Sequence, residues 1–289
     1  RTLCELAQPR TGVVTVIGPV HLQRLGSIEN IARAKTELIE ALPEDGHAIL
    51  NGDDPRVKAM WEKSKAPVMF YGLEPTNDIW ANEIESYGLE GTEFTVHYEG
   101  KQLRVRIPLL GRHSVHNALA ASAVGLTEEM SWEEIVNGLQ DVSAQLRLIA
   151  VPGKNGTTLL DDSYNASPHS MLAALNLLKD LDGRKIAILG DMRELGEYER
   201  KGHKVVGLRA ADVADVIIAV GDLGRQIGEA AKEAGNKETY FAQDNEEAVR
   251  VVEPLTRPGD VVLIKGSRGA HMEDIVSALS AAENGEELR

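Results

Sequence analysis

The sequence is poor in cysteine, with Cys4 as the single one among its 289 residues. One cysteine cannot form an internal disulfide, so a fold held by disulfides is excluded and a reducing, cytoplasmic location is predicted. The sequence also lacks an apolar run near the roughly 18–20 residues that a membrane-spanning helix needs. We therefore expect a cytoplasmic chain without membrane insertion.

Basic residues are scarce relative to acidic ones. Lys and Arg total 31 against 45 for Asp and Glu, which gives a formal net charge of −14. A nucleic-acid surface needs a basic face to neutralise phosphates, so no nucleic-acid partner is expected. The hydrophobic content of 43% is sufficient for one large or two ordinary hydrophobic cores.

Two common nucleotide-binding motifs are absent. Residues 153–158, GKNGTT, superficially suggest a P-loop, but a Walker A motif requires GxxxxGK followed by Ser or Thr between a strand and a helix. This segment precedes an expected strand, so it predicts a hairpin turn. No GxGxxG dinucleotide motif occurs either.

Strand and helix patterns alternate along the first half of the chain. An apolar, β-branched run predicts a strand over residues 13–17, and Ser27 is a typical start for a helix that continues to about residue 39. Short strands are expected at residues 48–50 and 68–71, with a helix after the NGDDP segment. Residues 92–107 alternate with period two and predict a β-hairpin added to this α/β layer.

The second half is a regular α/β repeat. Strands are expected at residues 158–160, 185–189, 216–220, 239–241 and 261–264, separated by helices. Polar and glycine residues follow the carboxyl ends of these strands, where open α/β sheets place their ligands. The pattern predicts two domains, residues 1–147 and a Rossmann-like domain over residues 148–289.

Two side chains near the first long helix could carry chemistry. His21 lies in the loop before the helix, and Lys35 lies on one of its faces. Taken alone, such a His is usually a hydrogen-bonding residue and such a Lys a solvated cation. The surrounding segment VVTVIGPVHLQRLGSIENIARAKTEL, however, resembles the NIGxAHLxxxGSxExIAxAKxEL pattern of the Mur ligases. These are the ATP-dependent amide-forming enzymes of peptidoglycan synthesis. Val16 replaces the Asn of the pattern.

The resemblance implies that His21 and Lys35 are catalytic and bind Mg²⁺, with Lys35 carbamylated into a carboxylate-like ligand suited to that ion. The segment GRHSVHNALAA is similar to the family's GxHNxxNALAA, which contacts the adenine of ATP. It implies nucleotide binding by His113, Ser114 and Asn117, with Ser114 in place of an Asn. Arg147 matches a family arginine that reaches the nucleotide phosphates, although on its own it could equally form an inter-domain ion pair.

Residues 161–168, DDSYNASP, resemble the DDSYNANP signature of the Mur ligases that add D-alanyl-D-alanine to UDP-N-acetylmuramoyl-tripeptide. The LGDMRELG and KGSRGAHME segments and His203 fit the same branch. The resemblance implies that Asp162 acts on the nucleotide or metal, and that Tyr164, Asn165 and Ser167 bind substrate. Ser167, which replaces an Asn, could instead cap the following helix.

The resemblance implies an α/β chain, the remainder of a P-loop-type ATPase domain with its β-hairpin followed by a Rossmann-like C-terminal domain. No N-terminal domain or GxxGKT motif precedes Val13, so this chain is expected to be a fragment, inactive alone. The expected enzyme is a monomer that uses ATP and Mg²⁺ to join D-alanyl-D-alanine to the UDP-linked tripeptide through an acyl phosphate. Two alternatives stay open: another ligase of the superfamily, of folylpolyglutamate or cyanophycin type, or a non-catalytic Rossmann-like binding module.

Overall fold

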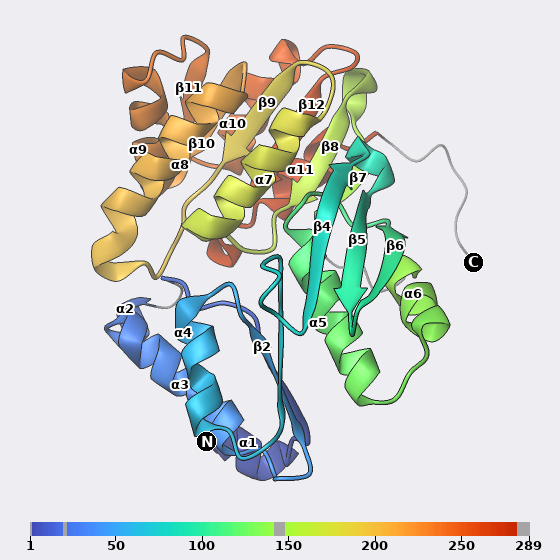
Figure 1. Ribbon diagram of the computed structural model, residues 1–289. Helices are drawn as coiled ribbons and strands as arrows, with labels where there is room; N and C mark the ends of the chain where they lie inside the picture. Colours follow the sequence, from blue (N-terminus) through green and yellow to red (C-terminus); the bar gives the residue numbers. More distant parts are fainter. Residues whose placement is uncertain (1, 20–21, 142–147, 282–289) are drawn as a thin grey trace, which may run out of the picture. The chain divides into compact units, whose positions relative to one another are not determined.

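The computed structural model describes residues 2–19, 22–141 and 148–281. The chain divides into two compact units, residues 1–144 and 145–289, each built around its own sheet (Figure 1). The predicted domain boundary after residue 147 stays a prediction, because residues 142–147 lie outside the described part of the chain.

The first unit contains a sheet in the order β1-β2-β3-β4-β5-β6 among its described residues. The first four strands pair in parallel, and β4, β5 and β6 pair antiparallel. The predicted β-hairpin is therefore confirmed as β5 and β6, and it continues the same sheet through β4, which the sequence patterns missed. The strands are β1 (Thr11–Val14), β2 (His47–Asn51), β3 (Val68–Gly72), β4 (Ile79–Ser86), β5 (Thr92–Tyr98) and β6 (Lys101–Ile107).

Helices cover both faces of the parallel part of this sheet. One core contains Ile39 of α3 and Val57 of α4, and the other contains Val115 and Leu119 of α5. The predicted helix start at Ser27 is confirmed, because its side chain accepts a hydrogen bond from the backbone N–H of Asn30. The helical elements are α1 (Thr2–Ala7), α2 (Leu22–Leu25), α3 (Ile28–Glu40), α4 (Pro55–Lys58), η1 (Ala59–Lys63), η2 (Gly88–Glu90), α5 (Ser114–Thr127) and α6 (Trp132–Gln140).

The second unit has the strand order β11-β10-β9-β12-β8-β7 in the described residues. All pairs are parallel except β7 with β8, and β7 was not predicted. The predicted hairpin turn at residues 153–158 is confirmed: it joins β7 to β8, and the Gly153 N–H donates to the Thr157 carbonyl oxygen at 2.9 Å. The strands are β7 (Ile149–Pro152), β8 (Thr158–Asp162), β9 (Lys185–Leu189), β10 (Val216–Val220), β11 (Thr239–Ala242) and β12 (Val261–Lys265).

Helices α10 and α11 pack against one face of this sheet, where Ile186, Ile218 and Ile264 form the core. Helices α7, α8 and α9 lie on the opposite face (Figure 1). Helices α8 and α9 pack closely because Gly207 has no side chain: a Cβ there would lie 2.3 Å from the Ile227 carbonyl oxygen. The helical elements are η4 (Lys154–Gly156), α7 (Pro168–Asp180), η5 (Gly196–Tyr198), α8 (Glu199–Val213), α9 (Gly221–Glu233), α10 (Asn245–Val252), η6 (Glu253–Leu255), η7 (Arg268–Ala270) and α11 (Glu273–Leu279).

Among the described residues, no helix combines the length and the apolar character needed to cross a bilayer. The central strands of the second unit are short, and two of them, β10 and β12, are buried at every position. Such strands are typical of a parallel sheet covered by helices on both faces.

We predict that residues 148–289 fold alone, because their sheet and both helical layers lie within one unit. The isolated segment should unfold in urea in one cooperative transition. Replacing the fully buried Ile218 with Ala should lower its free energy of unfolding by about 2–5 kcal/mol, through lost burial and a cavity.

The matched control is Ile149→Ala on the partly exposed strand β7, which should cost much less. A gradual, non-cooperative loss of structure in the isolated segment would show that the fold of this unit depends on residues before 148.

Candidate functional site

The loop that follows β1 is held by three side-chain contacts from neighbouring elements. Lys35 Nζ donates to the Val16 carbonyl oxygen at 2.8 Å, and Asn51 Nδ2 donates to the Thr15 carbonyl oxygen at 2.8 Å. The Ile17 N–H donates to Asp54 Oδ2 at 2.8 Å. These contacts replace sheet pairing, so the predicted strand over residues 13–17 is wrong at its end: β1 stops at Val14.

The surroundings of Lys35 change the pKa of its amino group. Although the side chain is exposed overall, desolvation around its amino group lowers the pKa of Lys35, while the Asp54 carboxylate opposes the shift. A lowered pKa increases the neutral amine, which is the form that reacts with carbon dioxide to give a carbamate. The contact partner of Lys35 is a backbone carbonyl, so Val16 supplies it without the Asn side chain of the family pattern.

An unmodified lysine does not fit Mg²⁺, because an ammonium group has no acceptor atom. Carbamate oxygens and a nearby backbone carbonyl are the hard oxygen donors that Mg²⁺ prefers. The described residues hold no cluster of three or more His, Cys, Asp or Glu side chains suited to a metal. The predicted metal ligand His21 and the predicted catalytic Arg147 both lie outside the described residues.

The three predicted nucleotide-binding residues at the start of α5 differ in how far they are exposed to solvent. Asn117 is exposed, His113 is half-buried at the N-cap position, and Ser114 is buried. The Ser114 hydroxyl donates to the Gly111 carbonyl oxygen at 2.7 Å, so its proton already takes part in an internal hydrogen bond. Of the three predicted residues, Asn117 is therefore the one with an exposed amide available for a ligand.

A polar cluster beside α5 was missed by sequence reasoning. Asp53 Oδ2 lies 2.9 Å from His116 Nε2 and accepts a hydrogen bond from the Leu73 N–H at 2.6 Å, and Asp53 Oδ1 accepts one from Asn77 Nδ2 at 2.9 Å. Burial alone would raise the pKa of Asp53, but these hydrogen bonds together lower it, so the carboxylate is held ionised. The position of the NGDDP segment just after a strand end pointed to Asp53 as a member of such a cluster. Its partner His116 is 63 residues away in the sequence, so the pairing could not be seen from the local pattern.

A buried ion pair joins β12 to β8 at their carboxyl ends in the second unit. Lys265 is 2% exposed and lies opposite Asp162 in the strand register, with 2.5 Å between Nζ and Oδ2. Lys265 Nζ also donates to the Asn165 carbonyl oxygen at 2.8 Å. Two predicted site residues, Asp162 and Asn165, are thus fixed by a lysine that the sequence analysis did not single out.

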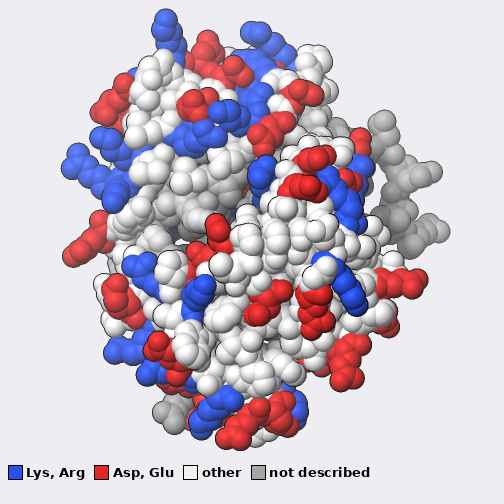
Figure 2. All heavy atoms as spheres, in the orientation of Figure 1, with Lys and Arg blue, Asp and Glu red and all other residues white. Residues whose placement is uncertain are grey.

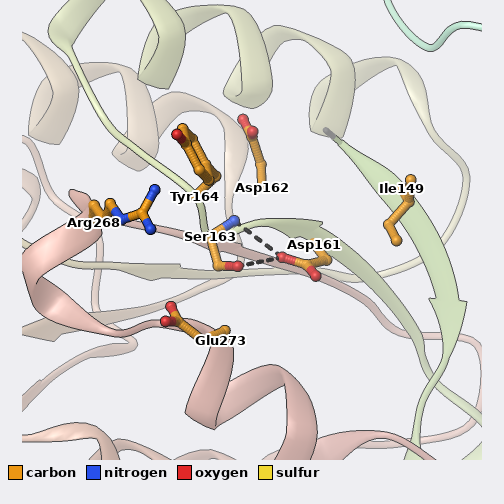
Figure 3. Close-up of a pocket in the computed structure, with 7 residues that line it drawn as sticks. All are labelled: Ile149, Asp161, Asp162, Ser163, Tyr164, Arg268 and Glu273. Carbon is orange, nitrogen blue, oxygen red and sulfur yellow. Dashed lines mark hydrogen bonds between the residues drawn. The ribbon is translucent and has the colours of Figure 1, made fainter. Parts of the chain in front are cut away.

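A pocket of about 270 Å³ lies beside this pair. Tyr164 and Arg268 lie on one side, with the guanidinium 5.1 Å from the centre of the Tyr164 ring, and Ile149 of β7 lies on the other (Figure 3). Ser163 donates to Asp161 Oδ1 from both its N–H at 3.0 Å and its hydroxyl at 2.6 Å (Figure 3). The lining residues are Ile149, Asp161, Asp162, Ser163, Tyr164, Arg268 and Glu273.

Ser167 forms the N-cap of α7, the role that competed with substrate binding in the sequence analysis. Its hydroxyl accepts from the Ser170 N–H at 3.3 Å, and the Ser170 hydroxyl reciprocally accepts from the Ser167 N–H at 3.0 Å. Pro168 occupies the first position of the helix. The local sequence is therefore sufficient to explain Ser167 as a cap.

The LGDMRELG segment and His203 organise the neighbouring strand end. Asp191 Oδ1 accepts hydrogen bonds from the Leu223 and Gly224 N–H groups at the start of α9, at 3.0 and 2.9 Å. His203 is fully buried: its Nδ1 donates to the Glu199 carbonyl oxygen at 2.7 Å, so Nε2 accepts from the Met192 N–H at 3.1 Å. Burial lowers the pKa of His203, which makes it a neutral structural residue.

On the face drawn in Figure 2, acidic and basic side chains are interspersed. That face therefore has no broad basic surface.

Both units thus place polar side chains just beyond the carboxyl ends of parallel strands, which is the arrangement of the α/β class whose open sheets bind ligands at this edge. Two family models match the chain: "Mur ligase middle domain" over residues 1–125 and "Mur ligase, glutamate ligase domain" over residues 146–268. The chain belongs to the Mur ligase family.

The relatives found by comparison point to one branch. UDP-N-acetylmuramoyl-tripeptide--D-alanyl-D-alanine ligase of Bacillus subtilis is 36% identical over 282 residues, covering 96% of this chain and 60% of the relative. The crystal structure of MurF from Acinetobacter baumannii has a TM-score of 0.83 at 32% identity, covering 95% of this chain and 60% of that one. MurF ligase from Thermotoga maritima, solved in complex with ADP, shares the fold at a TM-score of 0.83 and 24% identity, covering 95% and 62%. The chain thus spans about 60% of the length of these relatives.

We predict that Ser167→Ala lowers the free energy of unfolding by about 1 kcal/mol, because the N–H of Ser170 loses its cap. Ser167→Asn should change it by only a few tenths of a kcal/mol, since Asn caps equally well. Urea unfolding of the three proteins measures both values. A large stability loss for the Asn variant would contradict the cap as the main local role of this residue.

We predict that the second unit loses stability as the pH falls below about 6.5, the pKa of an unfolded histidine. The folded pKa of His203 is lowered, so acid protonates the unfolded chain first and favours it, by up to about 1.4 kcal/mol per pH unit. Urea unfolding between pH 7.5 and 5.5 should show this slope in the native protein and a smaller one in His203→Gln. The exposed His271→Asn serves as control and should keep the native slope.

Proposed function

We propose that the full-length protein to which this chain belongs is an ATP-dependent ligase. It joins D-alanyl-D-alanine to UDP-N-acetylmuramoyl-tripeptide for peptidoglycan synthesis. The observation that carries the proposal is the ordered edge of β8 and β12, where the subfamily segments DDSYNASP and KGSRGAHME meet through Lys265, Asp162 and Asn165. The relatives support it, because they are named for this activity. The alignment to the first of them covers 96% of this chain.

The reaction has two chemical steps. The terminal carboxylate of the tripeptide attacks the γ-phosphorus of ATP, which forms an acyl phosphate and releases ADP. The amine of the dipeptide then attacks the acyl carbon, an amide bond forms, and phosphate leaves while the amine loses a proton. Both ATP and the carboxylate are anions, so the site has to lower their mutual repulsion.

The residues of this chain have distinct roles in the proposal. Asn117 contacts the adenine by its exposed amide, with His113 beside it and Ser114 holding the turn at the helix start. Asp162 binds the ribose or metal in an orientation fixed by Lys265, Arg147 binds phosphates, and Tyr164 and Asn165 bind the incoming substrate. Ser167 acts through the cap that starts α7.

Mg²⁺, when bound, would offset the negative charge of the phosphates. His21 and the carbamate of Lys35 would hold it. Lys35 is suited to this role because its lowered pKa favours the reactive neutral amine and the Val16 carbonyl fixes its position. The proposed enzyme is a cytoplasmic monomer that acts on small molecules.

The test of the function is a ligation assay with the full-length protein. Release of ADP and phosphate should require both the UDP-linked tripeptide and D-alanyl-D-alanine, and the product should carry both. Nucleotide binding without any amide product, with every substrate combination, would instead favour a non-catalytic binding module.

We predict that Lys35 acts as a carbamate. In ¹³C-labelled bicarbonate, the NMR spectrum of this chain should show a carbamate carbon signal that Lys35→Ala removes and the exposed Lys65→Ala retains. In the full-length protein, Lys35→Ala should abolish ligation, and added short carboxylates should partly restore it. Full ligation by Lys35→Ala would remove this lysine from the mechanism.

A further inference from the structure

The first turn of α5, which carries Asn117, begins at a residue type that is not among the usual helix caps. The N-cap residue is His113, whereas α3 and α7 begin at serines. Serine, threonine, aspartate and asparagine are the preferred caps, because the first backbone N–H groups of a helix lack partners within it. The position of Asn117 therefore depends on other contacts that hold this first turn in place.

His116 supplies such a contact, because its Nε2 lies 2.9 Å from Asp53 Oδ2. Burial opposes ionisation of Asp53, but its hydrogen bonds outweigh this effect and lower its pKa. An ionised carboxylate can only accept, so Nε2 of His116 is the donor. The GxHNxxNALAA pattern leaves position 116 open, so this contact is a property of this chain and not of the pattern.

Asp53 is itself fixed by groups that follow β3. Its Oδ2 accepts from the Leu73 N–H at 2.6 Å, and its Oδ1 accepts from Asn77 Nδ2 at 2.9 Å. The close approach requires a glycine at the end of β3, because a Cβ at Gly72 would overlap Oδ1 of Asp53. Both carboxylate oxygens are therefore held in place, and His116 binds to a fixed acceptor.

The turn that carries Asp53 also holds the loop after β1. The Asp53 N–H donates to Asn51 Oδ1 at 3.0 Å, and Asn51 Nδ2 donates to the Thr15 carbonyl oxygen at 2.8 Å. The next residue, Asp54, accepts from the Ile17 N–H at 2.8 Å. These contacts fix the turn relative to the sheet, so it is a rigid anchor for the start of α5.

We propose that Asp53 and His116 are positioning residues that set the base specificity of the nucleotide site by fixing Asn117. The assignment rests on the proposed function, in which Asn117 contacts the adenine of ATP. A well-placed amide matches adenine, because it accepts from the N6 amino group and donates to N7, whereas guanine presents two acceptors at that edge. Displacement of Asn117 therefore weakens the binding of ATP and has little effect on the binding of GTP.

The test compares ATP with GTP in the full-length protein, by calorimetry for binding and by ligation kinetics. His116→Leu, which lacks the donor, should raise the Kd and the KM for ATP about tenfold, the effect of losing one well-placed hydrogen bond. The Kd for GTP and the kcat at saturating ATP should change little, because Asn117 contacts the base and not the reacting atoms. His116→Gln keeps an N–H donor and should restore most of the preference for ATP.

Two further variants separate positioning from a general effect on the fold. His97→Leu removes a comparable contact in the same unit, since His97 Nε2 lies 2.8 Å from Asn82 Oδ1, and it should leave the preference for ATP unchanged. In an Asn117→Ala background, His116→Leu should cause no further loss of this preference, because the pair acts through that amide.

Equal weakening of ATP and GTP binding in His116→Leu would show a purely structural role and overturn the assignment. Unchanged ATP binding in that variant, or a native protein that binds ATP and GTP equally or binds neither, would overturn it as well. The proposed function fails separately. If the nucleotide preference changes as expected but no amide product forms with any substrate combination, ligation is rejected and the positioning pair is retained.

Discussion

The buried ion pair between Lys265 and Asp162 is the constraint on which the edge of the second unit depends. Removing either partner would leave an uncompensated charge in a site where Lys265 is 2% exposed, at a cost of about 3–5 kcal/mol. Such a pair adds little net stability compared with apolar residues, but it requires one arrangement of its partners. Because Lys265 also binds the Asn165 carbonyl, that arrangement fixes the loop that carries Tyr164 and Asn165.

In the first unit, too, side chains from other elements fix a loop at the edge of the sheet, here by single hydrogen bonds. Lys35, Asn51 and Asp54 each bind a backbone group of the loop after β1. A loop fixed by side chains from other elements keeps its carbonyl groups away from sheet pairing, which explains why β1 ends at Val14. It also gives Lys35 the partly desolvated setting in which its pKa is lowered.

Much of the fold follows from local patterns in the sequence. The cap at Ser27 and the short buried strands of the second unit involve contacts within a few residues or continuous apolar runs, and these were predicted correctly. Ser167 was predicted to bind substrate, and its cap was the alternative that the structure shows. Strands β4 and β7 were missed for a physical reason. β4 includes four polar or charged residues within IWANEIES, with a bulge between Asn82 and Glu85, and β7 is mostly exposed, so neither shows a clear strand period.

For the candidate site residues, too, local sequence and tertiary structure determined different things. The sequence by itself determined the family, the segments that carry chemistry and the strand ends at which they lie, because motif and period are properties of neighbouring residues. Only the tertiary structure decided which charges meet: Asp53 with His116, Asp162 with Lys265, and Arg268 with no carboxylate in the described part of the chain. These partners come from elements far apart in sequence, and burial and charge pairing between such elements exist only once the sheets and helices have packed.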